Sequence, residues 1–142
     1  MTEGFTGLLV YIALKLIGYS GWSWAGLAWL GKDGRLSGAL ARGVGRLLIG
    51  WVTGLAVAPL ALVAAGTGHV TMFYFLVLPV VRWLEWGIIH VTLVPDHQGA
   101  AFVHGLSTRG RLWRAGGIVV SYLADLPFLV AEGGLPHGRI FC

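Results

Sequence analysis

Charged residues are scarce in this sequence. Of its 142 residues, 56% are hydrophobic and only 11% are charged, whereas a soluble domain carries roughly a quarter charged residues. This leaves too few polar side chains to cover the surface of a water-soluble fold of this length. The composition therefore predicts a membrane protein, in which lipid is the solvent. The length suits one domain of a few spans, with no room for a sizeable soluble module.

Cysteine is almost absent as well. The single cysteine, Cys142, excludes an intramolecular disulfide and any zinc or iron–sulfur site that needs several cysteines. His97 and His104 would align on a helix, but no further His or Cys stands at ligand spacing, so we interpret this segment as a loop in contact with water or headgroups. The sequence also lacks a phosphate-binding glycine loop, a serine elbow and an HExxH helix. We expect no metal and no cofactor.

Four long apolar stretches are present, at about residues 5–30, 44–65, 70–94 and 113–131. Each approaches or exceeds the ~20 residues with which a helix crosses about 30 Å of hydrocarbon. An open chain must be helical there, because lipid offers backbone amides no partner. We predict an all-α bundle of four transmembrane helices, in which "GTGH" (residues 66–69) joins the second and third spans as an antiparallel hairpin.

Basic residues are concentrated on one side of these predicted spans. The first connection and its helix edge hold Lys32, Arg35, Arg42 and Arg46; the third holds Arg109, Arg111 and Arg114; the second holds none, and the tails add only Arg139. The positive-inside rule places both basic connections in the cytoplasm and both termini outside. Trp29 and Trp113 fall at the predicted cytoplasmic boundary, as interfacial anchors. The pattern predicts a multi-pass protein of the cell membrane, typically a prokaryotic inner membrane, and explains the basic charge without nucleic acid.

Four charged side chains fall near the middle of the spans: Lys15, Arg82, Glu85 and Asp125. A lone charge at that depth costs about 2.5–3.5 kcal/mol on insertion scales. Arg82 and Glu85 are three residues apart, so they share a helical face and can pair directly. Because the formal charges sum to zero, we predict that the four side chains meet and neutralise one another inside the bundle. They serve either as structural ion pairs or as a relay or polar substrate site.

Two further polar residues could accompany this cluster. Gly117, Ser121 and Asp125 are spaced by four, which gives the last span a narrow small and polar stripe. His90 lies near the cytoplasmic end of the third span, on the face of Trp86. A pH-sensitive switch is one interpretation of His90, and an interfacial histidine packed on tryptophan is the other.

Helix-weakening residues stand close to the charged positions. Pro79 and Pro127 each remove a backbone hydrogen bond, which would free the carbonyls of Phe75 and Leu123 as acceptors. The first span could kink at residues 18–21, where glycine and serine are concentrated.

The second span carries small residues along one narrow face. Gly43, Gly50 and Gly54 lie on it, and the last two form a GxxxG step. Small residues allow close helix approach in lipid, with either another span or a second copy as the partner. Arg42 and Arg46 are placed off this face, and we expect both to reach the headgroups.

These patterns favour a non-enzymatic membrane subunit that packs into a homo-oligomer or a larger membrane complex, with lipids and other membrane chains as partners. The alternative is a small proton, ion or solute translocator, in which Glu85 and Asp125 titrate while Arg82 and Lys15 set their pKa. A third interpretation is an enzyme acting on lipid, which would use polar groups near the cytoplasmic headgroups: His90, Asp96 and His97.

Overall fold

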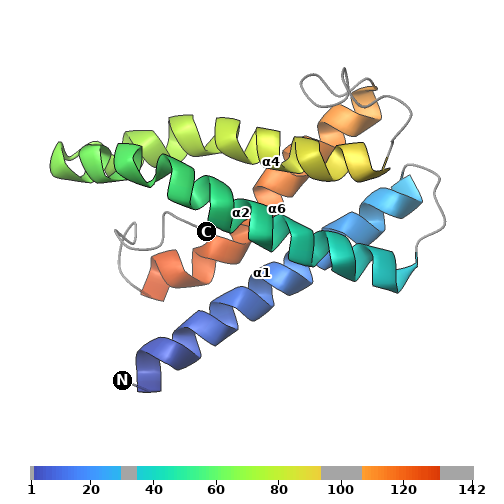
Figure 1. Ribbon diagram of the computed structural model, residues 1–142, viewed down its shortest axis with the longest axis horizontal. Coiled ribbons are helices and arrows are strands. Elements are labelled where there is room, and N and C mark those ends of the chain that lie inside the picture. The colour runs from blue at the N-terminus through green and yellow to red at the C-terminus, as the bar shows by residue number, and fades with distance from the viewer. Residues whose placement is uncertain (1, 30–34, 94–106, 132–142) are drawn as a thin grey trace.

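The chain is folded as an all-α bundle. A computed structural model describes residues 2–29, 35–93 and 107–131, and within these ranges it contains helices and no strand. Three of the long helices are α1 (Thr2–Trp29), α2 (Leu36–Gly66) and α6 (Thr108–Ala131). The fourth is continuous and made of three segments: α3 (Val70–Met72), η1 (Phe73–Val77) and α4 (Leu78–Leu93). Figure 1 shows how these helices cross one another.

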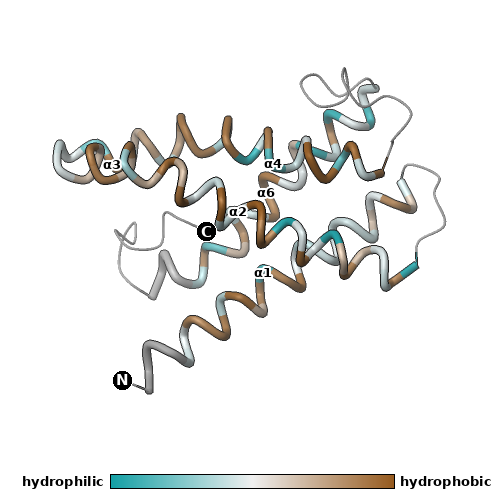
Figure 2. Tube along the Cα trace, in the orientation of Figure 1, coloured by the Kyte–Doolittle hydropathy of each residue, from teal (hydrophilic) through white to brown (hydrophobic). Residues whose placement is uncertain are grey.

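Two of the four helices are long and apolar enough to cross a membrane, as judged by length and composition: Leu36–Gly66 and Val70–Leu93. Their outward positions carry large apolar side chains, such as Leu55, which is 74% exposed. Figure 2 shows hydrophobic segments along all four helices, interrupted by single hydrophilic positions. The remaining helices, with 28 residues in α1 and 24 in α6, extend about 42 and 36 Å at 1.5 Å per residue.

The helices extend beyond the predicted spans. α2 begins at Leu36 rather than near residue 44, and α6 at Thr108 rather than near 113. Hydropathy marks only the apolar part of a helix, and both extensions carry arginines that favour an aqueous or headgroup environment. The helix is not interrupted at residues 18–21, where the sequence suggested a weak point, because α1 is helical from Thr2 to Trp29. A glycine inside a helix costs only about 1 kcal/mol relative to alanine, which packing can offset.

A tight turn joins α2 to α3, as the "GTGH" segment predicts. The amides of Thr67, Gly68 and His69 donate to carbonyls of the last turn of α2. Gly68 has a φ of +73°, a left-handed conformation that glycine adopts without a steric penalty. The two helices therefore run antiparallel, and Arg42 of α2 donates from Nε to Thr92 Oγ1 near the end of α4 at 3.2 Å.

A π-helical segment precedes Pro79. In η1 the hydrogen bonds span five residues, so the Leu78 amide donates to the Phe73 carbonyl. In this register the next carbonyl, that of Tyr74, would need the amide of residue 79, and proline has none. The Tyr122 hydroxyl of α6 donates to the Tyr74 carbonyl instead, at 2.9 Å. The sequence predicted that Pro79 would leave the Phe75 carbonyl without its helical partner. The π-helical register instead leaves the Tyr74 carbonyl without one, and the Tyr122 hydroxyl bonds to it.

A reciprocal pair of tryptophans joins α1 to α6. Trp22 Nε1 donates to the Trp113 carbonyl at 2.9 Å, and Trp113 Nε1 donates to the Trp22 carbonyl at 3.2 Å. A methyl group at Gly26 would overlap the Trp113 indole, and one at Gly116 would overlap the Trp22 indole. Each glycine therefore makes room for the indole of the opposite helix.

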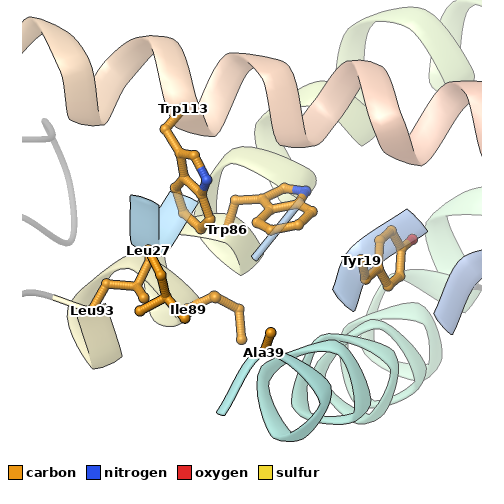
Figure 3. Close-up of a cluster of buried hydrophobic side chains, with 7 residues drawn as sticks. All are labelled: Tyr19, Leu27, Ala39, Trp86, Ile89, Leu93 and Trp113. Carbon is orange, nitrogen blue, oxygen red and sulfur yellow. The ribbon is translucent and has the colours of Figure 1, made fainter. Parts of the chain in front are cut away.

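The buried position of Trp113 corrects the expectation that it anchors the chain at the membrane boundary. Its side chain is only 2% exposed, whereas Trp29 is 53% exposed. Trp113 lies in an apolar cluster with residues of all four helices (Figure 3): Tyr19, Leu27, Ala39, Trp86, Ile89 and Leu93. The indole N–H already donates a hydrogen bond inside the bundle, so this tryptophan does not require a position at the membrane–water interface.

This packing predicts opposite outcomes for two alanine substitutions in α1. Gly26→Ala should destabilise the fold by about 1–3 kcal/mol, because a methyl group there forces the Trp113 indole to move. Gly21→Ala meets open space and should stabilise the helix by up to about 1 kcal/mol. Unfolding of the purified protein by SDS titration in mild detergent measures both. Equal stability of the two variants would contradict the reciprocal packing.

Candidate functional site

Asp125 is the centre of a buried ionic cluster. Its Oδ1 lies 3.0 Å from Lys15 Nζ, and its Oδ2 lies 2.6 Å from Arg82 Nη2. The Tyr11 hydroxyl donates to Oδ1 at 3.1 Å, and the Tyr74 hydroxyl approaches Oδ2 at 3.5 Å. Lys15 comes from α1, Arg82 from α4 and Asp125 from α6, so the structure brings together three of the four charged residues that the sequence singles out.

Helical periodicity explains how these side chains reach the interior. Tyr11, Lys15, Tyr19 and Ser23 follow one another at intervals of four along α1, and all are buried. The predicted stripe of α6, which includes Ser121 and Asp125, is buried as well. Residues four apart lie on one face of a helix. The contacts of Lys15 and Tyr11 with Asp125 show that the two stripes face each other.

Glu85, the fourth residue, has a different partner. Its carboxylate accepts hydrogen bonds from the Arg46 guanidinium and the Thr53 hydroxyl, both on α2. The direct Arg82–Glu85 pair expected from their spacing is therefore replaced by Arg82–Asp125 and Arg46–Glu85. α4 packs between two helices, and residues three apart are about 60° apart around its axis. Arg82 thus reaches α6, while Glu85 reaches α2.

The burial of Arg46 corrects the expectation that it extends to the headgroups. Its side chain is 3% exposed, and its guanidinium carbon lies 5.0 Å from the Tyr19 ring centre and 5.5 Å from that of Trp86. These distances are typical of cation–π contacts. The sequence spacing could have predicted this burial, because Arg46 is only about 40° from Gly50 around the helix and so lies close to the small-residue face.

The glycine face of α2 packs within the chain. Gly43, Gly50 and Gly54 are all buried. A methyl group at Gly43 would overlap the hydroxyl of Ser20 on α1, so the partner at that position is another helix of the same chain.

Ser121 of α6 forms a hydrogen bond with Trp86 of α4. Its hydroxyl donates to the Gly117 carbonyl at 2.9 Å and accepts from Trp86 Nε1 at 3.3 Å. The Trp86 indole lies directly over Gly117, where a methyl group would overlap it. Ser121 thus holds Trp86 between α4 and α6 and has a structural role in this arrangement.

His90 lies in a separate buried contact. Its Nδ1 accepts a hydrogen bond from Arg114 Nε at 3.1 Å, and an accepting nitrogen carries no proton. The ring lies 5.8 Å from the ring of Trp113 and packs against Gly110 at the start of α6. The charged neighbour of His90 is therefore Arg114, which the sequence had placed among the basic residues of a cytoplasmic connection.

Several sequence candidates lie outside the described residues: Asp96, His97, His104 and Cys142. Within residues 2–29, 35–93 and 107–131, no group of His, Cys, Asp and Glu side chains could hold a metal ion. The site that the structure describes is therefore made of ion pairs and hydroxyl groups.

The observed pairing predicts the result of double-mutant cycles. Removing one partner of a buried pair costs about 3–5 kcal/mol, so Arg46→Gln and Glu85→Gln should each be strongly destabilising. Because they break the same contact, their combination should show a coupling energy of about 1–3 kcal/mol. Arg82→Gln with Glu85→Gln should show a markedly smaller one. SDS titration measures each cycle, and a larger coupling for Arg82 and Glu85 would contradict the structure.

No protein family, curated protein or solved structure matches this chain.

Proposed function

We propose that this chain is a non-enzymatic membrane subunit, inserted through four helices, whose interior ion pairs determine how those helices pack. One observation carries the proposal. Within residues 2–29, 35–93 and 107–131, each of the three buried ion pairs joins two different helices. Lys15–Asp125 joins α1 to α6, Arg82–Asp125 joins α4 to α6, and Arg46–Glu85 joins α2 to α4. Together they connect all four helices, which is the arrangement expected of charges that specify helix partners.

The distribution of exposed residues supports insertion of the bundle into a cell membrane. Large apolar side chains lie on the outer faces of the helices, where lipid would solvate them. Exposed arginines stand at the helix ends that adjoin the first and third connections: Arg35, Arg109 and Arg111. These ends would face the cytoplasm, with both termini on the other side. Outer apolar faces can also contact further copies of the chain or other membrane proteins.

The alternative is a proton, ion or solute translocator that uses Glu85 and Asp125. In its favour, buried polar side chains follow one another from Tyr11, whose hydroxyl contacts Asp125, to Arg114 near the start of α6. Against proton transfer, each carboxylate accepts hydrogen bonds from a guanidinium, a group that stays charged at any physiological pH. An enzyme acting on lipid gains no support from His90, because that ring is buried.

Exchanging the partners of one pair separates these functions. The double variant Arg46→Glu with Glu85→Arg restores opposite charges between α2 and α4, so it should recover assembly that Glu85→Gln disrupts. Native mass spectrometry of complexes extracted from the membrane measures the assembly. If Glu85→Gln assembles normally and loses pH-dependent flux in liposomes, the translocator is correct and the subunit proposal is wrong.

The proposed orientation predicts which cysteines react from outside. In a Cys142→Ser background, Thr67→Cys lies in the exposed turn before α3 and Arg109→Cys at the exposed start of α6. A membrane-impermeant maleimide should label Thr67→Cys in intact cells and Arg109→Cys only after permeabilisation. The opposite labelling would show that the topology is inverted. Labelling of both cysteines in intact cells would contradict the proposed orientation.

A further inference from the structure

His90 is enclosed where the last turn of α4 meets the first turn of α6 (Figure 1). It is 3% exposed, and a methyl group added at Gly110 would overlap its ring. Its Nδ1 accepts a hydrogen bond from Arg114 Nε at 3.1 Å, so this nitrogen carries no proton. The contact therefore requires the uncharged form of a side chain that changes its charge between about pH 5 and pH 8.

Positive groups of α6 face the His90 ring. The Arg114 guanidinium is one. The amino end of the helix is the other, since Ser107 Oγ accepts a hydrogen bond from the Gly110 amide at 3.0 Å in the first turn, and the start of a helix carries a partial positive charge. A proton on Nδ1 would replace the acceptor by a second donor and add a like charge beside both groups. This consequence is independent of the other contacts of Arg114, because the proton occupies the atom that accepts the bond.

Charged groups on the surrounding helices have partners of their own. These are Lys15 on α1, Arg42 and Arg46 on α2, Arg82 and Glu85 on α4, and Asp125 on α6. Arg109 and Arg111, at the start of α6, are exposed and positive as well. Among the described residues, Arg114 is thus the charged side chain that acts on His90, and its charge has the same sign as that of a protonated imidazole.

We propose that His90 forms an acid-sensitive contact between α4 and the start of α6, which is closed when the ring is neutral and opens when it is protonated. The opening is local. Trp113 stays bonded to Trp22, and the ion pairs of Asp125 hold the rest of α6, so residues 108–112 are the part released. Under the orientation proposed above, the pH that is sensed is that of the cytoplasm. This last step rests on the proposed function, whereas the contact itself does not.

Hydrogen–deuterium exchange of the purified protein in detergent measures the opening, because an amide exchanges when its local structure opens. A solvated histidine is half protonated near pH 6.5, so the start of α6 should open about tenfold more often at about pH 5.5 than at about pH 7.5. After correction for the pH dependence of chemical exchange, protection of the amides of residues 110–113 should fall by that factor, while protection in the middle of α2 should not change. Equal protection of residues 110–113 at the two pH values would overturn the proposal.

Histidine variants test which ring is responsible. His90→Asn places an amide oxygen where Nδ1 accepts from Arg114 and does not titrate, so this variant should keep its protection at both pH values. His69→Gln, in the exposed turn before α3, is the matched control and should respond to acid as the wild type does. His97→Gln, which removes the histidine nearest along the chain, should do the same. An acid response that persists in His90→Asn, or that disappears in either control, would overturn the assignment to His90.

Gly110→Ala tests the position of the ring without changing a titratable group. The added methyl group forces the imidazole out of the contact, so protection at the start of α6 should already be low at neutral pH and change little in acid. This variant remains informative if His90→Asn fails to fold. Protection and an acid response like those of the wild type would overturn the placement of His90 against Gly110. The exchange of Arg46 and Glu85 remains a separate test of the subunit role, because the two experiments measure different contacts.

Discussion

A carboxylate held between two cations from other helices is the contact on which this bundle depends. Asp125 of α6 has Lys15 of α1 on one oxygen and Arg82 of α4 on the other. None of these charges can be left alone in a dry interior, because an isolated ion there has lost its hydration. Their mutual positions are therefore strongly constrained, and the positions of three helices with them. The Arg46–Glu85 pair extends the same constraint to α2.

Small residues make this ionic interior possible. A guanidinium or an indole needs space between two helices, and a helix lined with large side chains would not provide it. Gly26, Gly116 and Gly117 each accept a tryptophan ring from an opposite helix, and Gly43 accepts Ser20. The indole N–H groups of Trp22 and Trp113 then bond to backbone carbonyls across the interface. Aromatic rings thus fill the interior without leaving their polar atoms unpaired.

The sequence predicts the helices well and their mutual contacts less well. Apolar length and the turn around Gly68 are local properties, so four helices and one hairpin could be expected from them. The pairing of Lys15 and Arg82 with Asp125 was also within reach, because each lies near mid-span. Arg46 was missed since its position near a predicted connection suggested a headgroup role, although its spacing from Gly50 places it on the inner face. Which of two neighbouring helices a charged side chain reaches depends on packing that no single helix encodes.

For the bundle inserted in lipid that we propose, ionic contacts provide a choice of helix partner that apolar packing cannot provide. Lipid chains are as apolar as leucine, so an apolar helix face gains little by choosing another helix over lipid. A charged group differs in this respect, because only an oppositely charged or hydrogen-bonding partner on another helix stabilises it. α6 illustrates the point. In the sequence, residues 94–107 separate it from α4, and two of the three ion pairs between described residues, together with both tryptophan hydrogen bonds, hold it against α1 and α4. The polar contacts are thus concentrated on the helix that chain connectivity constrains least, which is where specific pairing has the greatest effect.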